Sequence, residues 1–208
     1  MLRSVNLGLG ALLAVFLTAA LAQSPDRIPL DTGFRSTMNH YATVDRADGK
    51  VYQIYINDLA LNAWRDERHL PSGTVFAIES FLAEVDANGD VVLDANRRMI
   101  AAASENDIHV AMKSENWADD GRLTTVGLLF GEETEGGTWR MAGFDPRDGS
   151  EHTELSMAEC HECHVDHRAE DFILSRGLLD RYVRSGMPAY ISFSCGEREI
   201  CFGSPRAD

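Results

Sequence analysis

The sequence predicts an α+β fold, mainly an antiparallel β-sheet with a short N-terminal helix and a C-terminal helical segment. Runs rich in β-branched and aromatic residues, separated by glycine turns, fill the middle of the chain. Asn88-Gly89 is a dipeptide typical of a two-residue hairpin turn, which joins antiparallel strands. Helical spacing of apolar residues begins only after Gly143, so helices follow the strands instead of alternating with them.

Residues 1–22 have the features of a secretory signal peptide. Arg3 supplies the positive charge, Leu7–Ala20 form the apolar run, and Ala20-Leu21-Ala22 matches the small-residue cleavage pattern. The apolar run is shorter than the ~20 residues that a membrane span requires. We therefore expect a periplasmic protein that has no membrane association after the signal is removed.

The remaining chain is expected to form a domain over residues 23–179, followed by a C-terminal tail over residues 180–208. The formal net charge is −14 at pH 7. Nucleic acids and anionic membranes both require a basic patch, so this charge argues against either as a partner.

The N-terminal half predicts short elements separated by turns. Asp31-Thr32 precedes a short helix expected within residues 33–40. Asp48-Gly49-Lys50 is a turn, and Val51–Ile56 follows as a strand. Residues 59–64 are expected to form another short helix.

The later elements follow the same rules. The sequence predicts strands at Thr74–Val85 after the Pro71-Ser72-Gly73 turn, at 91–93 after the hairpin turn, and at 108–113, 123–130 and 138–143, with Gly136-Gly137 between the last two. It predicts helices at Glu151–Met157 and Glu170–Val183, on either side of a cysteine cluster.

That cluster, residues 158–167, reads AECHECHVDH. Cys160, Cys163 and His164 match C-x-x-C-H, the attachment pattern of c-type haem. The two thiols would form thioether bonds to one haem, and His164 would bind the iron as the proximal ligand. Export agrees with this prediction, because c-type haem is attached on the far side of the membrane. His152, His161 and His167 are expected at the surface near the haem edge.

Three alternatives compete with haem attachment. A thioredoxin-like C-x-x-C opens a helix within a βαβ unit, and no such unit is predicted. A zinc site needs a second ligand pair at suitable spacing, and the next cysteines, Cys195 and Cys201, lie far along the chain. A chance match is the third. In an oxidising compartment, Cys195 and Cys201 are expected to form a disulfide that closes the tail.

An electron carrier would need a second axial ligand, commonly methionine or histidine. Met187 is the single methionine downstream of His164. In the small cytochromes c, however, the haem motif lies near the N-terminus and the methionine far downstream. A six-coordinate carrier is therefore an alternative and not the leading interpretation.

Several short stretches occur in an order that resembles the cytochrome P-460 and cytochrome c′-β family over Gly33–Leu179. They are Phe34-Arg35-Ser36, residues 51–60, Pro71–Phe76, Trp117, the Cys160–His164 motif and residues 170–174. The resemblance implies a homodimer of β-sheet subunits, each with one five-coordinate haem. The open iron position would take nitric oxide, carbon monoxide or a nitrogen compound such as hydroxylamine.

Family members whose lysine is cross-linked to the porphyrin oxidise hydroxylamine and pass electrons to a partner cytochrome, whereas members without the cross-link bind gases. Only Lys50 and Lys113 occur in this chain. Lys50 is expected to be a solvated turn lysine, and Lys113 is the better candidate, although a surface lysine at a strand end is the alternative. The segment in which a cross-linking lysine would be sought first contains Arg97-Arg98. A guanidinium group is too basic to act as the nucleophile that forms the cross-link. We therefore expect no cross-link.

Strand alternation supplies the candidates for the distal side. Residues on one face of the predicted strand are Val75, Ala77, Glu79, Phe81 and Ala83. Glu79 is an acid on an otherwise apolar face, so it is either partnered or functional, for example in moving protons. Arg35 is a candidate for binding an oxyanion or a haem propionate. Phe76 and Phe81 either cap the iron or pack in the core.

Overall fold

The computed structural model describes residues 28–117, 136–152, 164, 171 and 173–192. Several predicted features lie outside these residues: the signal peptide, the strand at 123–130, most of the helix at 151–157 and all four cysteines. In the described part of the chain, no helix combines the length and apolar character needed to cross a bilayer.

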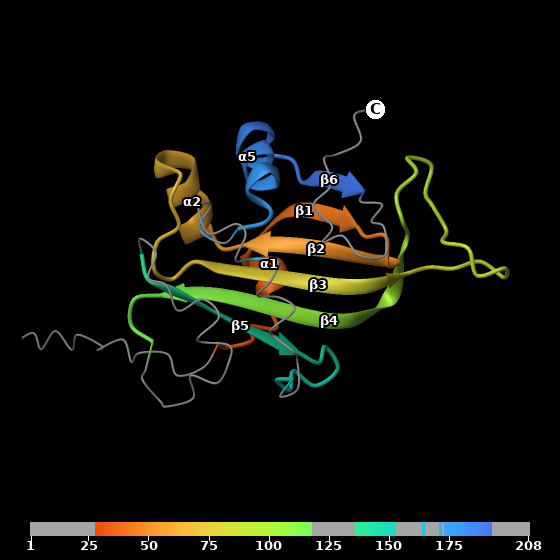
Figure 1. Cartoon of the computed structure of the whole chain (residues 1–208), viewed down its shortest axis with the longest axis horizontal. Helices are drawn as coiled ribbons and strands as arrows, with labels where there is room; N and C mark the ends of the chain where they lie inside the picture. Colours follow the sequence, from red (N-terminus) through yellow and green to blue (C-terminus); the bar gives the residue numbers. More distant parts are fainter. Residues whose placement is uncertain (1–27, 118–135, 153–163, 165–170, 172, 193–208) are drawn as a thin grey trace, which may run out of the picture.

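A mixed six-stranded sheet forms the body of the molecule (Figure 1). Its strands are β1 (Asn39–Asp45), β2 (Lys50–Ile56), β3 (Val75–Ala83), β4 (Ala101–Ser114), β5 (Thr138–Phe144) and β6 (Ala189–Ser192). They lie in the order β5-β4-β3-β2-β1-β6. The described helices are α1 (Phe34–Thr37), α2 (Asp58–Glu67) and α5 (Arg176–Ser185).

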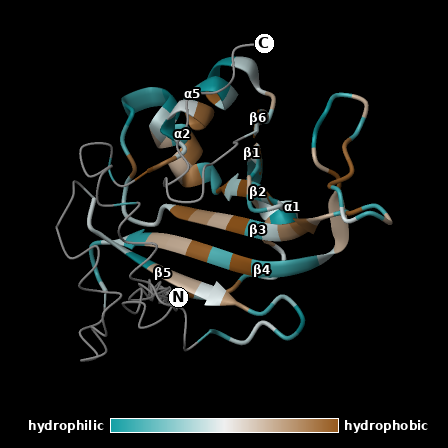
Figure 2. Ribbon diagram, turned by 45° about the vertical axis from the view of Figure 1, so that its right-hand side comes forward, coloured by the Kyte–Doolittle hydropathy of each residue, from teal (hydrophilic) through white to brown (hydrophobic). Residues whose placement is uncertain are grey.

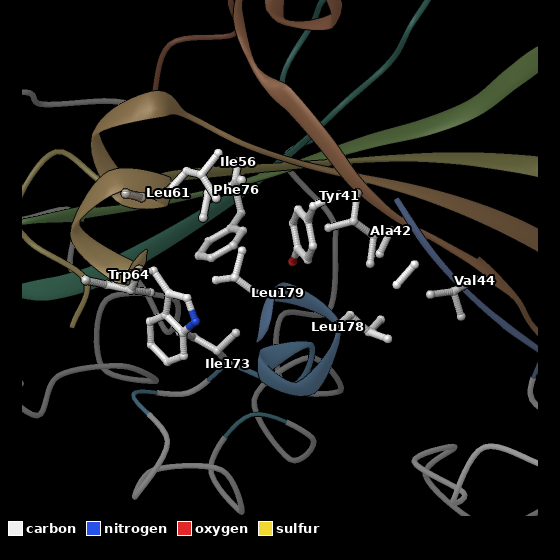
Figure 3. Close-up of a cluster of buried hydrophobic side chains, with 14 of the residues drawn as sticks. Tyr41, Ala42, Val44, Ile56, Leu61, Trp64, Phe76, Ile173, Leu178 and Leu179 are labelled. Atoms are coloured by element: carbon white, nitrogen blue, oxygen red, sulfur yellow. The ribbon is translucent and has the colours of Figure 1, made fainter. Parts of the chain in front are cut away.

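Each face of the sheet carries its own apolar core. Side chains alternate between the faces of a strand, and Figure 2 shows this alternation of hydropathy along β4. One face packs against α2 and α5, and Figure 3 shows Tyr41 and Phe76 of the sheet beside Leu179 of α5. The other face carries Tyr55, Ala77 and Val110 and packs against Phe34 of α1. We call these the α2/α5 face and the α1 face.

A polar bond joins the two helices of the α2/α5 face. Trp64 of α2 is buried in the core, and its indole Nε1 donates a hydrogen bond to Asp180 of α5 at 2.8 Å. Asn57 is the N-cap of α2, because its side chain accepts a hydrogen bond from the Ala60 amide at 3.3 Å. The α2/α5 face therefore has a fixed helical cover over one end of the sheet.

The predicted sheet was incomplete, because β1 and β6 were not predicted. The N-terminal helix ends at Thr37, and β1 begins within the range assigned to that helix. β6 pairs in parallel with β1, while the other neighbouring strands are antiparallel. The sheet is therefore mainly antiparallel, as predicted, and the parallel pair at this edge was not indicated by the sequence. The domain boundary expected after residue 179 falls inside α5.

The helical predictions near the C-terminus were partly wrong. Glu151 forms an isolated bridge with Phe144, so no helix begins there. The described part of the later helix begins at Arg176, not at Glu170. Asp171 has a φ of 56°, a left-handed conformation incompatible with a helical position. α5 is a helix that follows the cysteine cluster, but the predicted helical haem-binding segment itself lies outside the described residues, apart from His164, and stays a prediction.

The hairpin predicted at Asn88-Gly89 is present as an arm over residues 84–100, between β3 and β4 (Figure 1). Gly89 has a φ of 87°, as this turn requires. β3 ends at Ala83, two residues before the predicted Val85, and the arm has only isolated bridges such as Val85 to Val91.

Candidate functional site

The segment that contains the cysteine motif can be located from its two described ends. Cys160 and Cys163 lie outside the described residues, and His164 is helical and half-buried. His152 immediately precedes the undescribed stretch before the motif, and Asp171 follows the motif. The contacts of these two residues therefore show where the segment begins and ends.

The beginning of the segment is held at β4 and β5. The ring Nε2 of His152 lies 3.0 Å from Asp107 Oδ1 on β4. The backbone amide of His152 donates to the carbonyl of Gly143 on β5 at 2.8 Å. One side-chain contact and one backbone contact thus fix this end of the segment.

The other end is held at the far part of the same two strands. Asp171 Oδ2 accepts a hydrogen bond from Lys113 Nζ on β4 at 2.7 Å, and its Oδ1 accepts one from Trp139 Nε1 on β5 at 3.3 Å. Ile173 follows and is buried in the core beneath α2 and α5. This end is therefore held by an ion pair and by apolar packing.

Both ends lie on the α2/α5 face. Asp107 and Lys113 are separated by an even number of residues in the regular part of β4, so their side chains point to the same side. At about 3.3 Å per residue they are roughly 20 Å apart along the strand. The segment that carries the haem motif therefore starts and finishes over this one face.

A half-buried apolar surface lies between the two anchors. Ile78 of β3, Ala111 of β4 and Met141 of β5 are partly exposed and pack against the core of the α2/α5 face. We call these three residues the apolar patch. The register places Ile78 opposite His109 and Ala111 opposite Met141, so the patch crosses adjacent strands.

Asp107 connects two histidines at the edge of the patch. Its Oδ2 lies 2.7 Å from His109 Nε2, and its Oδ1 lies 3.0 Å from His152 Nε2. Burial acts to raise the pKa of Asp107, but the hydrogen bonds and charges of the two histidines outweigh it and lower the pKa. Among the described residues, no group of three or more His, Cys, Asp or Glu side chains is arranged so that it could hold a metal ion.

Sequence reasoning expected His152 at the surface and did not select His109 or Asp107. The His152 side chain is 35% exposed, in agreement with that prediction. The signal that was available for His109 is its alternation on the strand predicted at 108–113, and Asp107 lies one residue before that strand. Their meeting with His152 depends on the pairing of β4 with β5, which local patterns do not reveal.

Lys113 is buried, so the alternative of a surface lysine at a strand end was wrong. Its side chain is 1% exposed, and its Nζ donates to the carbonyl of Leu70 at 3.0 Å as well as to Asp171. The amine also lies 5.7 Å from the ring centroid of Trp139. Lys50 was expected in a turn but is the first residue of β2, where its side chain is 36% exposed and its Nζ lies 3.9 Å from Asp48.

The structure places Glu79 and Arg35 together on the α1 face. Glu79 is 1% exposed, and both Nε and Nη2 of Arg35 contact its carboxylate. Tyr55 donates its hydroxyl to Glu79 Oε2 at 2.8 Å, and Glu105 lies 2.5 Å from Arg35 Nη2. Burial and the hydrogen bond to Glu79 raise the pKa of Tyr55. The acid on the apolar face is thus partnered, and a catalytic role for it stays a prediction.

Replacing Glu79 with glutamine is expected to lower the free energy of unfolding by about 1–2 kcal/mol, because charge-assisted hydrogen bonds are lost at a buried site. Arg35 is 44% exposed and keeps Glu105, which limits the cost. Because Glu79 faces away from the apolar patch, the affinity for carbon monoxide, a ligand that the family resemblance implies, is expected to change less than about twofold. Urea denaturation and a ligand titration check the two values, and a selective loss of ligand affinity would return Glu79 to the catalytic candidates.

The other distal and axial candidates have separate positions. Phe76 is buried between Tyr41 and Trp139, with ring centroids 6.1 and 5.8 Å away, and so packs in the core. Phe81 is half-buried in β3, two residues after Glu79 in the sequence. Met187 is 68% exposed in the turn between α5 and β6.

A comparison with protein families agrees with this arrangement. The model for Cytochrome P460 matches residues 31–175, which is more than half of the 208-residue chain. The matched region includes the cysteine motif, the apolar patch and both anchors of the segment. A comparison with curated proteins gave no match. The chain therefore belongs to the cytochrome P460 family and is a haem protein.

Proposed function

We propose that the chain is an exported cytochrome with one covalently attached c-type haem, which binds a small ligand at an open iron position. Cys160 and Cys163 would form the thioether bonds, and His164 would bind the iron. The observation that carries this proposal is the anchoring of the motif segment at Asp107 and Lys113, on one face of β4.

The residues of this face suit a haem. Two thiols and an imidazole at this spacing form the donor set of c-type attachment. His164 is half-buried, and the apolar patch offers a surface for a large planar apolar group. When bound, the haem would supply an iron that coordinates the ligand and changes oxidation state.

Two observations favour a ligand binder over the other candidate functions. The amine of Lys113 is engaged by Asp171 and the Leu70 carbonyl, which opposes a cross-link of the kind linked with hydroxylamine oxidation. Met187 is exposed in a turn beyond α5, which opposes its use as a buried sixth ligand of an electron carrier. Nitric oxide, carbon monoxide, nitrogen oxides and hydroxylamine are the small ligands that we propose for the open iron position.

The proposal also covers the location of the protein, its oligomeric state and its redox partner. The signal-like residues 1–22 support a periplasmic location. Family membership supports a homodimer, and a net charge of −14 suits a basic redox partner cytochrome better than an acidic one.

Spectra of the protein made with a periplasmic haem-attachment system test the open site. A high-spin ferrous spectrum whose Soret band shifts on addition of carbon monoxide is expected. A sharp low-spin spectrum indifferent to carbon monoxide would instead show a six-coordinate carrier. A ferrous band displaced far to the red would indicate a cross-linked porphyrin and an oxidase.

A cysteine exchange tests the attachment. The double variant Cys160→Ser, Cys163→Ser should lose all its haem when the denatured protein is extracted with acidified acetone, because no thioether bond holds it. The double variant Cys195→Ser, Cys201→Ser is the matched control and should keep its haem through the same extraction. If the first variant retained haem, or the second lost it, the attachment residues proposed here would be wrong.

A further inference from the structure

The His109–Asp107–His152 cluster lies where a polar ligand on the haem would need a partner. His109 points to the α2/α5 face, next to Ala111 on β4 and opposite Ile78 on β3. His152 begins the segment that carries the haem motif. The cluster therefore borders the apolar patch and also touches the segment that we propose holds the haem.

The geometry fixes which atoms of the two rings remain for a ligand. Both contacts to Asp107 use Nε2, and a carboxylate accepts hydrogen bonds, so Nε2 of each ring carries the proton. Nδ1 is then left on each ring, as an acceptor in the neutral form and as a donor in the protonated form. Among the described residues, none is recorded as a partner of His109 Nδ1.

The exposure of the cluster suits contact with a small ligand. The side chains of His109 and His152 are 23% and 35% exposed, and that of Asp107 is 19% exposed. They are thus held by each other and partly shielded from water. A hydrogen bond made in such surroundings contributes more than one made at an open surface.

The other ionisable groups are not placed to be the hydrogen-bond partner of a polar ligand on the haem. Lys113, on the same face, is occupied by Asp171 and Leu70. The Glu79–Arg35 pair lies on the α1 face, behind the sheet. Among the described residues of β4, the histidine cluster adjoins the apolar patch on one side and the already paired Lys113 adjoins it on the other.

We propose that His109, oriented by Asp107 and His152, is a specificity-determining residue that hydrogen-bonds a polar nitrogen ligand on the haem and so favours hydroxylamine-type ligands over carbon monoxide. This inference rests on the proposed function, because it requires haem on the α2/α5 face. Carbon monoxide is a poor hydrogen-bond acceptor when bound, so its affinity depends little on His109. Hydroxylamine has both donors and acceptors, so its affinity depends on His109 directly.

Ligand titrations of the haem-loaded protein test the assignment. His109→Leu should weaken hydroxylamine binding to the ferric protein about tenfold or more, the equivalent of one hydrogen bond of about 1.4 kcal/mol. Carbon monoxide binding to the ferrous protein should change less than about twofold. His109→Gln, which can still donate and accept, should recover part of the hydroxylamine affinity.

His69→Leu is the matched control, because His69 is a half-buried histidine that follows α2, contacts Glu67 and is not part of the Asp107 cluster. It should leave both affinities unchanged. Equal losses for the two ligands in His109→Leu, or an unchanged hydroxylamine affinity, would overturn the assignment. If that variant does not fold, Asp107→Asn must show the same selective loss, and its absence would overturn the assignment equally. A wild-type protein that binds neither ligand would overturn the proposed function itself.

Discussion

Replacing Lys113 with methionine is expected to lower the free energy of unfolding by about 3 kcal/mol and to reduce the amount of haem that the purified protein carries. Removing one partner of a buried ion pair leaves the other charge uncompensated, which typically costs about 3–5 kcal/mol. The Asp171 side chain is 23% exposed, so water offsets part of this cost. The Leu70 carbonyl also loses its donor.

The loss of haem follows from the position of Asp171. Its carboxylate holds the end of the segment that begins at His152 and contains Cys160, Cys163 and His164. Without Lys113, the contact to this carboxylate that remains from the described residues is the longer hydrogen bond from Trp139, at 3.3 Å. A loosened segment presents its thiols and its histidine less well during haem attachment.

Lys50→Met is the matched control, because Lys50 is the only other lysine and its side chain, 36% exposed at the start of β2, has a weak contact to Asp48 at 3.9 Å. It should change stability by less than about 0.5 kcal/mol. Adding Asp171→Asn to Lys113→Met should restore part of the loss, because asparagine removes the unpaired charge and tolerates the left-handed φ of 56°. Equal unfolding midpoints for the two lysine variants would show that the buried ion pair does not hold the segment.

Two of the predicted strands pair with their neighbours without a break in side-chain alternation. Val51–Ile56 lies inside β2, and residues 138–143 lie inside β5. β1 has a register shift between His40 and Ala42, which breaks the alternation that would have indicated a strand. β6 has only four residues and pairs with β1, a partner far away in sequence. Its signal is therefore long-range contact, not local pattern.

The site also has a part that local sequence predicts and a part that it does not. The cysteine motif is local, and Cys160, Cys163 and His164 were selected from spacing alone. The anchors are not local, because His152 and Asp107 are 45 residues apart and Lys113 and Asp171 are 58 apart. Arg35 and Glu79 were each selected, but their pairing across 44 residues was not predicted. Sequence reasoning thus supplied the residue types, and strand register decides which of them meet.

Gly137→Ala is expected to lower the free energy of unfolding by at least about 3 kcal/mol. Gly137 lies in the Gly136-Gly137 turn, which controls the register of β4 with β5. Gly137 has a φ of 110°, a conformation that residues with a Cβ rarely adopt. A Cβ there would overlap the Ser114 carbonyl group at the end of β4 and lie 2.5 Å from the Glu115 amide nitrogen. Both obstacles are backbone atoms, so relief requires β4 and β5 to move apart.

That movement would act directly on the haem segment, because Lys113 and Trp139 are paired across β4 and β5 and both hold Asp171. Gly89→Ala is the matched control: its φ of 87° imposes the same kind of strain, but no atom lies within 4 Å of the added Cβ. It should cost only about 1 kcal/mol and leave haem content unchanged. Urea unfolding and the haem-to-protein absorbance ratio distinguish the variants. If Gly137→Ala cost no more than Gly89→Ala, the close approach of the turn to β4 would not control the anchor, and the ion pair alone would hold Asp171.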